Sequence, residues 1–259
     1  MPAATTLATN TMAIRLNQPA KAGRGSPAKP LALLRTFIAL LLWLLLASAQ
    51  AQLVRREIVY DNTRFPVLVD GNQQYLSRTN EIGDEISLAG TARIVTEFLF
   101  EYFGDFRPDG DERARVRFYA NDGPGVYLKP QTVLWDSGWT LPVGTNRYAR
   151  MSLQIPDIVV PDTFTWSVEF EGVTQTDGDR LGLLLYHPPT VGAPLAGGKI
   201  GSYNDYWRNT RGVWSFFQIN NGAIPANFAA RVIAVPEPST LGLALAAGIV
   251  WVGWRCRRR

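Results

Sequence analysis

The chain has 259 residues, 46% of them hydrophobic, and a formal net charge of +4. Its basic groups are concentrated at the ends, since residues 1–51 carry five and residues 236–259 carry four. The segment between them holds 17 basic and 21 acidic groups, so this middle part is acidic and argues against a nucleic-acid partner. The only cysteine is Cys256, which leaves the middle part without a disulfide or a thiol site.

The first 51 residues have the organisation of a secretory signal peptide. Residues 1–35 are polar and basic, residues 36–46 form an apolar run, and residues 47–52 read Ala-Ser-Ala-Gln-Ala-Gln. This order of segments ends in a small-x-small cleavage site for signal peptidase. We expect cleavage between Ala51 and Gln52, with Ala49 as the second choice. Two alternatives stay open: translation from Met12, and an uncleaved signal anchor.

Residues 52–234 alternate between polar and apolar side chains with period two and show almost no helical stripe. In residues 113–118, for example, three arginines share one face and Ala, Val and Phe share the other. Turn motifs rich in Asp, Asn and Gly separate the predicted strands. The pattern predicts an all-β domain, an antiparallel β-sandwich of jelly-roll type, between an N-terminal signal helix and a C-terminal transmembrane helix. The predicted strands cover residues 58–60, 85–88, 94–103, 113–118, 132–135, 148–155, 164–170, 181–186, 214–219 and 228–235.

Catalytic machinery is hard to assemble from this middle segment. His187 is the only histidine, and no Gly-x-Ser-x-Gly elbow accompanies it, so a catalytic triad is not expected. Two glutamate pairs suggest a remote glycoside-hydrolase hypothesis. Glu97 and Glu101 would lie about 13 Å apart along one strand, whereas Glu169 and Glu171 would lie about 7 Å apart. Solvated strand faces are the far more common explanation of such glutamates, and we expect the protein not to be an enzyme.

Two groups of residues are candidates for ligand binding. Asp109, Asp111 and Glu112 form an acidic loop whose oxygens would suit calcium, although its spacing is not that of an EF-hand and hairpin turns have the same composition. We therefore expect no firm metal site and no cofactor. A second hypothesis is a glycan-binding module that stacks sugars on exposed aromatic rings. The alternative is that the same rings close the open ends of the sandwich. These aromatic candidates are Trp139, Tyr203, Tyr206 and Trp207.

The last 25 residues form a tripartite ending. Residues 235–239 read Val-Pro-Glu-Pro-Ser, residues 239–254 form an apolar run, and the chain stops at Arg-Cys-Arg-Arg-Arg. As a helix the run spans about 24 Å, short of the roughly 20 residues that usually cross a bilayer. Interfacial tryptophans make a short span feasible, and the positive-inside rule keeps the basic end cytoplasmic. The alternative is a buried C-terminal helix. The basic residues are Arg255, Arg257, Arg258 and Arg259.

This ending resembles the PEP-CTERM sorting signal of biofilm-forming Gram-negative bacteria, in its motif residues Val235, Pro236, Glu237, Pro238 and Ser239. The resemblance implies processing near this motif by a membrane-embedded enzyme of the exosortase type, in a setting where exopolysaccharide is made. Four segments of the middle part also resemble ectodomains that precede the same tail, which implies architecture and export but no activity. They cover residues 83–91, 114–122, 160–166 and 227–232.

The sequence therefore predicts three parts: a signal peptide (1–51), a β-sandwich ectodomain (52–234) and a sorting segment (235–259). Residues 233–237 are expected to form a short stalk. The leading hypothesis is an exported, non-catalytic surface or biofilm-matrix protein associated with exopolysaccharide. It would first be held at the cytoplasmic membrane by its C-terminal helix, with the ectodomain outside, and would then reach the cell surface or the extracellular matrix.

Overall fold

The computed structural model describes residues 38–39, 41–42, 55–77, 80–125, 128–173, 178–192 and 204–237. The chain divides into two compact units, Met1–Leu44 and Leu45–Arg259, and every described strand lies in the second. In the first unit, residues 38–39 and 41–42 are helical. None of the described helical segments is long and apolar enough to cross a membrane. The rest of the predicted signal peptide and the predicted helix 239–254 lie outside the described residues.

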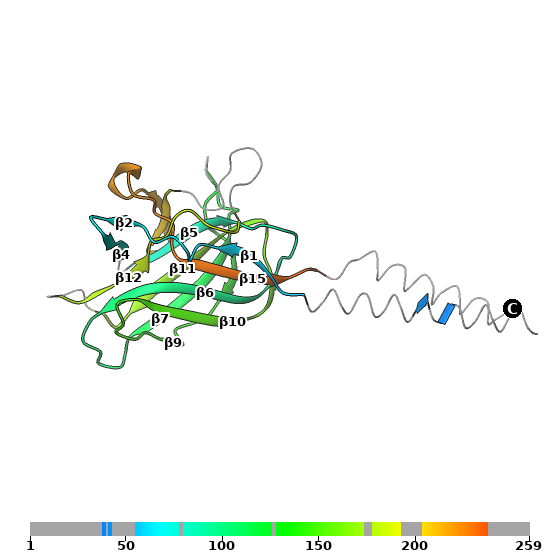
Figure 1. Ribbon diagram of the computed structural model, residues 1–259, viewed down its shortest axis with the longest axis horizontal. Helices are drawn as coiled ribbons and strands as arrows, with labels where there is room; N and C mark the ends of the chain where they lie inside the picture. Colours follow the sequence, from blue (N-terminus) through cyan, green and yellow to red (C-terminus); the bar gives the residue numbers. More distant parts are fainter. Residues whose placement is uncertain are drawn as a thin grey trace, which may run out of the picture. The chain divides into compact units, whose positions relative to one another are not determined.

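Six antiparallel strands form the first main sheet (Figure 1). The long strand β6 is its centre: β10 pairs with one edge of β6, and β15 and β12 pair with successive parts of the other edge. Strand β1 then pairs with β15, and β4 pairs with β12. The strands are β1 (Glu57–Asp61), β4 (Tyr75–Ser77), β6 (Ile94–Asp105), β10 (Ala149–Val159), β12 (Arg180–Leu184) and β15 (Ala230–Val235).

Seven antiparallel strands form the second main sheet, in the order β14-β13-β5-β11-β7-β8, with β9 also paired to β7. They are β5 (Glu81–Ser87), β7 (Arg113–Ala120), β8 (Val133–Asp136), β9 (Leu141–Pro142), β11 (Thr163–Glu171), β13 (Tyr206–Thr210) and β14 (Val213–Phe217). A small hairpin of β2 (Leu68–Val69) and β3 (Asn72–Gln73) and the 3-10 turn η1 (Asn220–Gly222) complete the described elements.

The two sheets share one hydrophobic core, because every second residue of their strands points inward. Trp166 of β11 is fully buried at its centre. Its ring lies 5.1 Å from that of Phe98 on β6 and 6.1 Å from that of Phe228, which precedes β15. The prediction of an all-β fold with antiparallel sheets is confirmed, whereas the jelly-roll type stays a prediction.

Strand β13 is the main element that the sequence analysis did not predict. Tyr206 and Trp207, which the sequence suggested as exposed sugar-stacking rings, open β13 and pair with Phe217 and Phe216 of β14. The hairpin turns at Arg211-Gly212, where both residues have positive φ, of 53° and 84°. Two-residue turns of this kind usually carry Asn-Gly or Asp-Gly, so Arg-Gly gave only a weak signal.

Candidate functional site

The predicted stalk at residues 233–237 is wrong, because strand β15 continues to Val235. Ile233 pairs with Ile58 of β1 on one side and with Glu97 of β6 on the other. Pro236 has no backbone N–H to give to a sheet ladder, and the strand stops immediately before it. The Pro-Glu-Pro motif therefore begins directly at the end of a strand whose alternate residues are buried in the core.

The other sorting and cleavage residues cannot be placed in the fold. Pro236 and Glu237 are the only described residues that follow β15. The positions outside the described residues are Ala49, Ala51, Gln52, Pro238, Ser239, Arg255, Arg257, Arg258 and Arg259.

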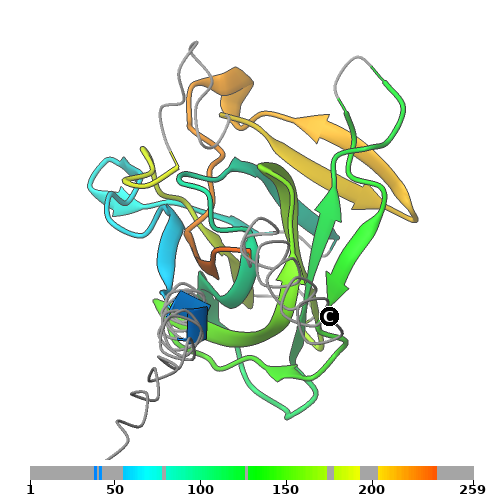
Figure 2. The same cartoon turned by 90° about the vertical axis from the view of Figure 1, so that its right-hand side faces the viewer.

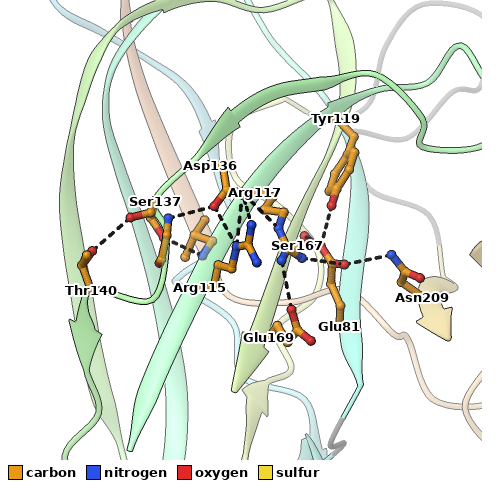
Figure 3. A network of polar contacts seen from close by, with 12 residues as sticks. Glu81, Arg115, Arg117, Tyr119, Asp136, Ser137, Thr140, Ser167, Glu169 and Asn209 are labelled. Atoms are coloured by element: carbon orange, nitrogen blue, oxygen red, sulfur yellow. Dashed lines mark hydrogen bonds and ion pairs between the residues drawn. The ribbon is translucent and has the colours of Figure 1, made fainter. Parts of the chain in front are cut away.

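A charged network covers the middle of the outer face of the seven-stranded sheet (Figure 3). At its centre the Glu81 carboxylate, only 4% exposed, pairs with the Arg117 guanidinium at 2.8 Å. Three further groups donate hydrogen bonds to this carboxylate: the hydroxyls of Tyr119 (2.8 Å) and Ser167 (2.6 Å), and the amide of Asn209 (2.9 Å). Each oxygen of this buried carboxylate therefore has two donors, so its hydrogen-bonding capacity is filled by side chains of the protein.

Arg117 joins this centre to two further carboxylates. Its guanidinium lies 3.1 Å from Glu169 of β11 and 3.4 Å from Asp136 of β8. Burial opposes the charge of Arg117, but the hydrogen bond and the charge of Glu81 outweigh it, so the pKa of Arg117 lies above its usual value. Asp136 also accepts a 2.9 Å hydrogen bond from Arg115, and this contact lowers the pKa of Asp136 to about 2. This network thus has three carboxylates matched by two guanidinium groups.

A depression of about 380 Å³ lies beside this network, and we call it the outer-face pocket. Polar side chains dominate its lining, and Arg211, at the tip of the β13–β14 hairpin, contributes a further cation. Carboxylate, guanidinium and amide groups in one depression can donate to and accept from a hydroxyl-rich ligand. The lining residues are Asn80, Glu81, Arg117, Glu169, Asn209, Arg211 and Gly212.

The β13–β14 hairpin folds over part of the same face (Figure 2, orange arrows at the upper right). Three strands separate β14 from β7 in the sheet order, a distance of about 19 Å at normal strand spacing. Yet the ring of Trp214 on β14 lies 5.2 Å from that of Tyr119 on β7. The sheet must therefore curl, and Trp207, Trp214 and Tyr119 form a small apolar cluster separate from the main core.

Burial corrects the expectation that Tyr206 and Trp207 present open rings. Tyr206 is 2% exposed and packs in the main core, and Trp207 is 3% exposed beneath the hairpin. Neither ring has a free face on which a sugar could stack. Trp139 is half-buried and lies 5.9 Å from the Arg115 guanidinium, at one end of the charged network. Tyr203 lies outside the described residues.

The acidic loop brings its three predicted carboxylates together. Ligand oxygens of Asp109, Asp111 and Glu112 lie within 4.8 Å of one another. Both oxygens of Glu112 accept backbone hydrogen bonds, from Asp109 (2.7 Å) and Gly110 (3.0 Å), and Asp109 accepts one from Asp111. These bonds close the loop and account for the clustering without an ion. Calcium binding at this loop stays a prediction.

The two predicted glutamate pairs are each occupied by contacts with neighbouring strands. Glu97 accepts a hydrogen bond from Ser152, and Glu101 pairs with Arg150 at 2.6 Å, both on the outer face of the six-stranded sheet. Glu169 pairs with Arg117, whereas Glu171 is exposed at the end of β11. The structure thus brings Glu169 near Glu81 of a different strand, a combination that no spacing within one strand could reveal.

His187, the only histidine, lies where the chain leaves strand β12. Its Nδ1 lies 2.7 Å from the side-chain amide nitrogen of the fully buried Asn227. Burial lowers the pKa of His187, so the ring is neutral at pH 7. No serine or carboxylate partner is found for this ring among the described residues. His187 therefore has the contacts of a packed loop histidine.

Sequence reasoning missed Glu81, Asn209 and Ser167 as network members. A weak signal did exist, because arginines on one face of a strand are often paired with carboxylates on the neighbouring strands, as Arg115 and Arg117 are here. Glu81 stands at the first position of β5, and neither its strand neighbours nor its depth can be read from local sequence.

The comparison with protein families gives one match. Residues 234–259 match the model of the PEP-CTERM protein-sorting motif. No curated protein and no solved structure matches the chain significantly. The chain thus carries a PEP-CTERM sorting signal, which indicates export, membrane-anchored transit and recognition by an exosortase-type processing enzyme. The match begins at Ala234, inside strand β15.

Proposed function

We propose that this exported protein is a non-catalytic component of the cell surface or biofilm matrix that associates with exopolysaccharide. The observation that carries the proposal is the sorting motif at residues 234–259. In this proposal signal peptidase removes residues 1–51, the C-terminal helix holds the protein in the membrane, and exosortase-type processing releases the sandwich.

Contacts among the carboxylates support a non-catalytic role. A general acid or base needs a carboxyl group that can exchange a proton with its substrate. Glu81 already has four partners, and Glu169 shares the guanidinium of Arg117. Glycoside hydrolysis by Glu169 or Glu171 is kept as the remote alternative, and an activity that Glu169→Gln abolishes would establish it.

A second candidate function, a glycan-binding module, is favoured by the outer-face pocket. Sugar hydroxyls pair well with a mixed set of carboxylate, amide and guanidinium groups, and a nearby aromatic ring can stack on a sugar face. Asn209 lines the pocket, and Trp139 lies at the other end of the charged network, beside Arg115. The outer-face pocket and Trp139 replace Tyr206 and Trp207 as the candidate glycan-binding surface, since Tyr206 and Trp207 are buried.

The sorting part of the proposal is tested by intact-mass measurement of the protein recovered from its host. We expect a species that begins at Gln52 and lacks the residues after the Pro-Glu-Pro motif. Glu237→Ala provides the comparison, because the altered motif should leave the C-terminal helix in place and the protein in the membrane. Full-length wild-type protein lodged permanently in the membrane would contradict the proposal.

The polysaccharide part is tested by co-sedimentation of the protein with the host's exopolysaccharide. We expect Trp139→Ala and Asn209→Ala to weaken binding several-fold. Tyr148→Ala is the matched control, because Tyr148 is an exposed aromatic residue (62%) outside the charged network. Equal binding by the wild type and all three variants would remove the outer-face pocket from the proposal, and no binding by the wild type would remove the polysaccharide.

A further inference from the structure

An apolar patch interrupts the outer face of the six-stranded sheet at the end where the chain leaves the sandwich. Ile58 pairs with Ile233, and Val235 pairs with Ile94, which pairs in turn with Val159. Residues paired across neighbouring strands share a face, and so do positions i and i+2 along one strand. These five aliphatic residues therefore form one surface, which we call the exit patch.

The exit patch faces away from the core. Ile58 is 45% exposed and Val159 is 57% exposed, while Ile94, Ile233 and Val235 are half-buried. The inward-facing neighbours Val95, Val232 and Ala234 are fully buried. An outer sheet face is normally polar, and a contiguous apolar surface marks a site of contact with a partner or a membrane.

Further along the same outer face the side chains are charged. Arg150 pairs with Glu101 at 2.6 Å, and Arg231 pairs with Asp61 at 2.8 Å. A second apolar group also lies further along this face, formed by Phe103, Leu184 and Ala229 with Tyr75 and Tyr186, but its members are buried or half-buried against one another. The exposed aliphatic side chains of the six strands are therefore found at one end of the sheet. Two arginines, Arg55 and Arg56, stand next to that end. Arg55 lies 3.6 Å from Glu57 and Arg56 lies 4.0 Å from Glu97, but the two arginine side chains are 78% and 60% exposed, so both pairs are open to solvent and to headgroups.

Chain length fixes how far the exit patch can lie from the membrane. Val235 belongs to the patch, and only residues 236–238 separate it from the apolar run that begins at Ser239. Even fully extended, those four residue steps span at most about 14 Å. Because β1 begins opposite the end of β15, with Glu57 paired to Ala234, the chain enters the sandwich at this same end (Figure 1).

We propose that the exit patch, flanked by Arg55 and Arg56, rests on the lipid surface while the C-terminal segment anchors the protein. The aliphatic side chains of Ile58 and Val159 reach the interfacial region, and the two arginines attract anionic headgroups. Processing near the Pro-Glu-Pro motif then removes the tether and exposes the patch. This inference depends on the membrane-anchored stage alone and not on any binding of polysaccharide.

The test measures lipid contact at two matched positions of the full chain. In a Cys256→Ser background, Val159→Cys and, separately, Val213→Cys are labelled with an environment-sensitive fluorophore. Val213 is the control because it is also an exposed strand valine (62%), on β14 of the other sheet. The proteins are reconstituted in phosphatidylethanolamine–phosphatidylglycerol vesicles with and without brominated lipid. We expect several-fold stronger quenching and a blue-shifted emission at position 159.

A second substitution, with its own control, tests whether the quenching at position 159 depends on apolar contact between the exit patch and the lipid and not only on closeness to the membrane. Ile58→Asp should reduce the quenching at position 159 several-fold, whereas Val133→Asp, at a 50%-exposed strand position of the other sheet, should leave it unchanged. Circular dichroism of each variant verifies that the sandwich is folded. Equal quenching at positions 159 and 213, or none at 159, overturns the inference. A concentration-dependent signal at 159 in lipid-free detergent would assign the patch to a second copy, which also overturns it.

Discussion

The outer faces of the two sheets differ in the kind of side chain that covers them. On the seven-stranded sheet, long polar side chains lie beneath the β13–β14 hairpin and are held by a network in which Arg117 touches three carboxylates. On the six-stranded sheet, the exit end presents aliphatic side chains such as Ile58 and Val159 beside Glu97, and no hairpin lies over them among the described elements.

This difference separates a surface that contributes to the stability of the fold from a surface that is suited to contact with other molecules. A buried ion such as Glu81 is costly without its partners, so the charged face is coupled to the fold. An aliphatic residue that keeps about half of its surface in water gains less from folding than a core residue does. The charged face should therefore be sensitive to substitution in the isolated protein, and the exit patch should be sensitive only when a membrane is present.

The largest expected effect comes from removing the cation at the centre of the network. Arg117→Met leaves Glu81 buried without its guanidinium partner, and we expect the free energy of unfolding to fall by about 3–5 kcal/mol. Urea unfolding followed by tryptophan fluorescence measures this loss. The double variant Glu81→Gln, Arg117→Met should recover most of it, because the uncompensated buried charge is then absent.

Arg147→Met is the matched control for that substitution. Arg147 pairs with Asp105 at 3.3 Å, but the two side chains are 72% and 41% exposed, so the pair is screened by solvent. We expect a loss of less than about 1 kcal/mol. If Arg117→Met costs no more than Arg147→Met, the charged face contributes no more to the fold than an ordinary surface, and the contrast between the faces fails.

A smaller effect is expected at Asp205, directly before β13. Burial and the charge of Glu85 raise the pKa of Asp205 to about 6. The folded state then holds this proton more tightly than the unfolded state, whose carboxyl has a pKa of about 3.9, so stability falls as the pH rises from about 4 to about 6. Asp205→Asn removes that loss, and after solvent screening we expect it to stabilise the protein by about 1 kcal/mol at pH 7.

Thermal unfolding at pH 4 and pH 7 tests this prediction. The stabilisation by Asp205→Asn should be present at pH 7 and nearly absent at pH 4, because the wild-type carboxyl is then protonated in the folded state. Asp162→Asn, at an 85%-exposed carboxylate paired with Arg93, serves as the control and should show no such gain at pH 7. A gain of equal size at both pH values would mean that the substitution acts through packing and not through the proton.

Local sequence was sufficient for most of the longer strands but not for β13 or for the face that carries the network. Period-two alternation located β7 and β11 because their large apolar residues lie mainly on one side. The strand β6 was found as a longer apolar run, with apolar residues on both of its faces. Alternation failed at β13, where Tyr206 packs in the core and Trp207 packs beneath the hairpin, so both faces of the strand are aromatic. The alternation that marks a half-buried strand is then lost.

The sorting motif, the charged network and the exit patch also differ in how well local sequence predicts them. The sorting motif is a contiguous stretch that an enzyme reads along the chain, so the sequence alone identified it. The pair of Glu81 and Arg117 depends on β5 and β7 both lying beside β11, which is a property of strand order across the whole sheet. The exit patch likewise depends on register, since Ile58, Ile94 and Val159 come from three distant segments.

The smallest effect on the free energy of unfolding is expected from substitutions in the exit patch. A small effect would distinguish these residues from residues of the core. Val159→Ser and Ile58→Ser each replace a side chain that is about half exposed, so we expect the free energy of unfolding in detergent to change by no more than about 0.5 kcal/mol. Val168→Ser, at a fully buried valine of β11, should be far more damaging. If the two exit-patch variants were as damaging as Val168→Ser, their side chains would belong to the core. If they are as mild as expected, the fold does not account for this aliphatic surface, which is the result that the proposed lipid contact requires.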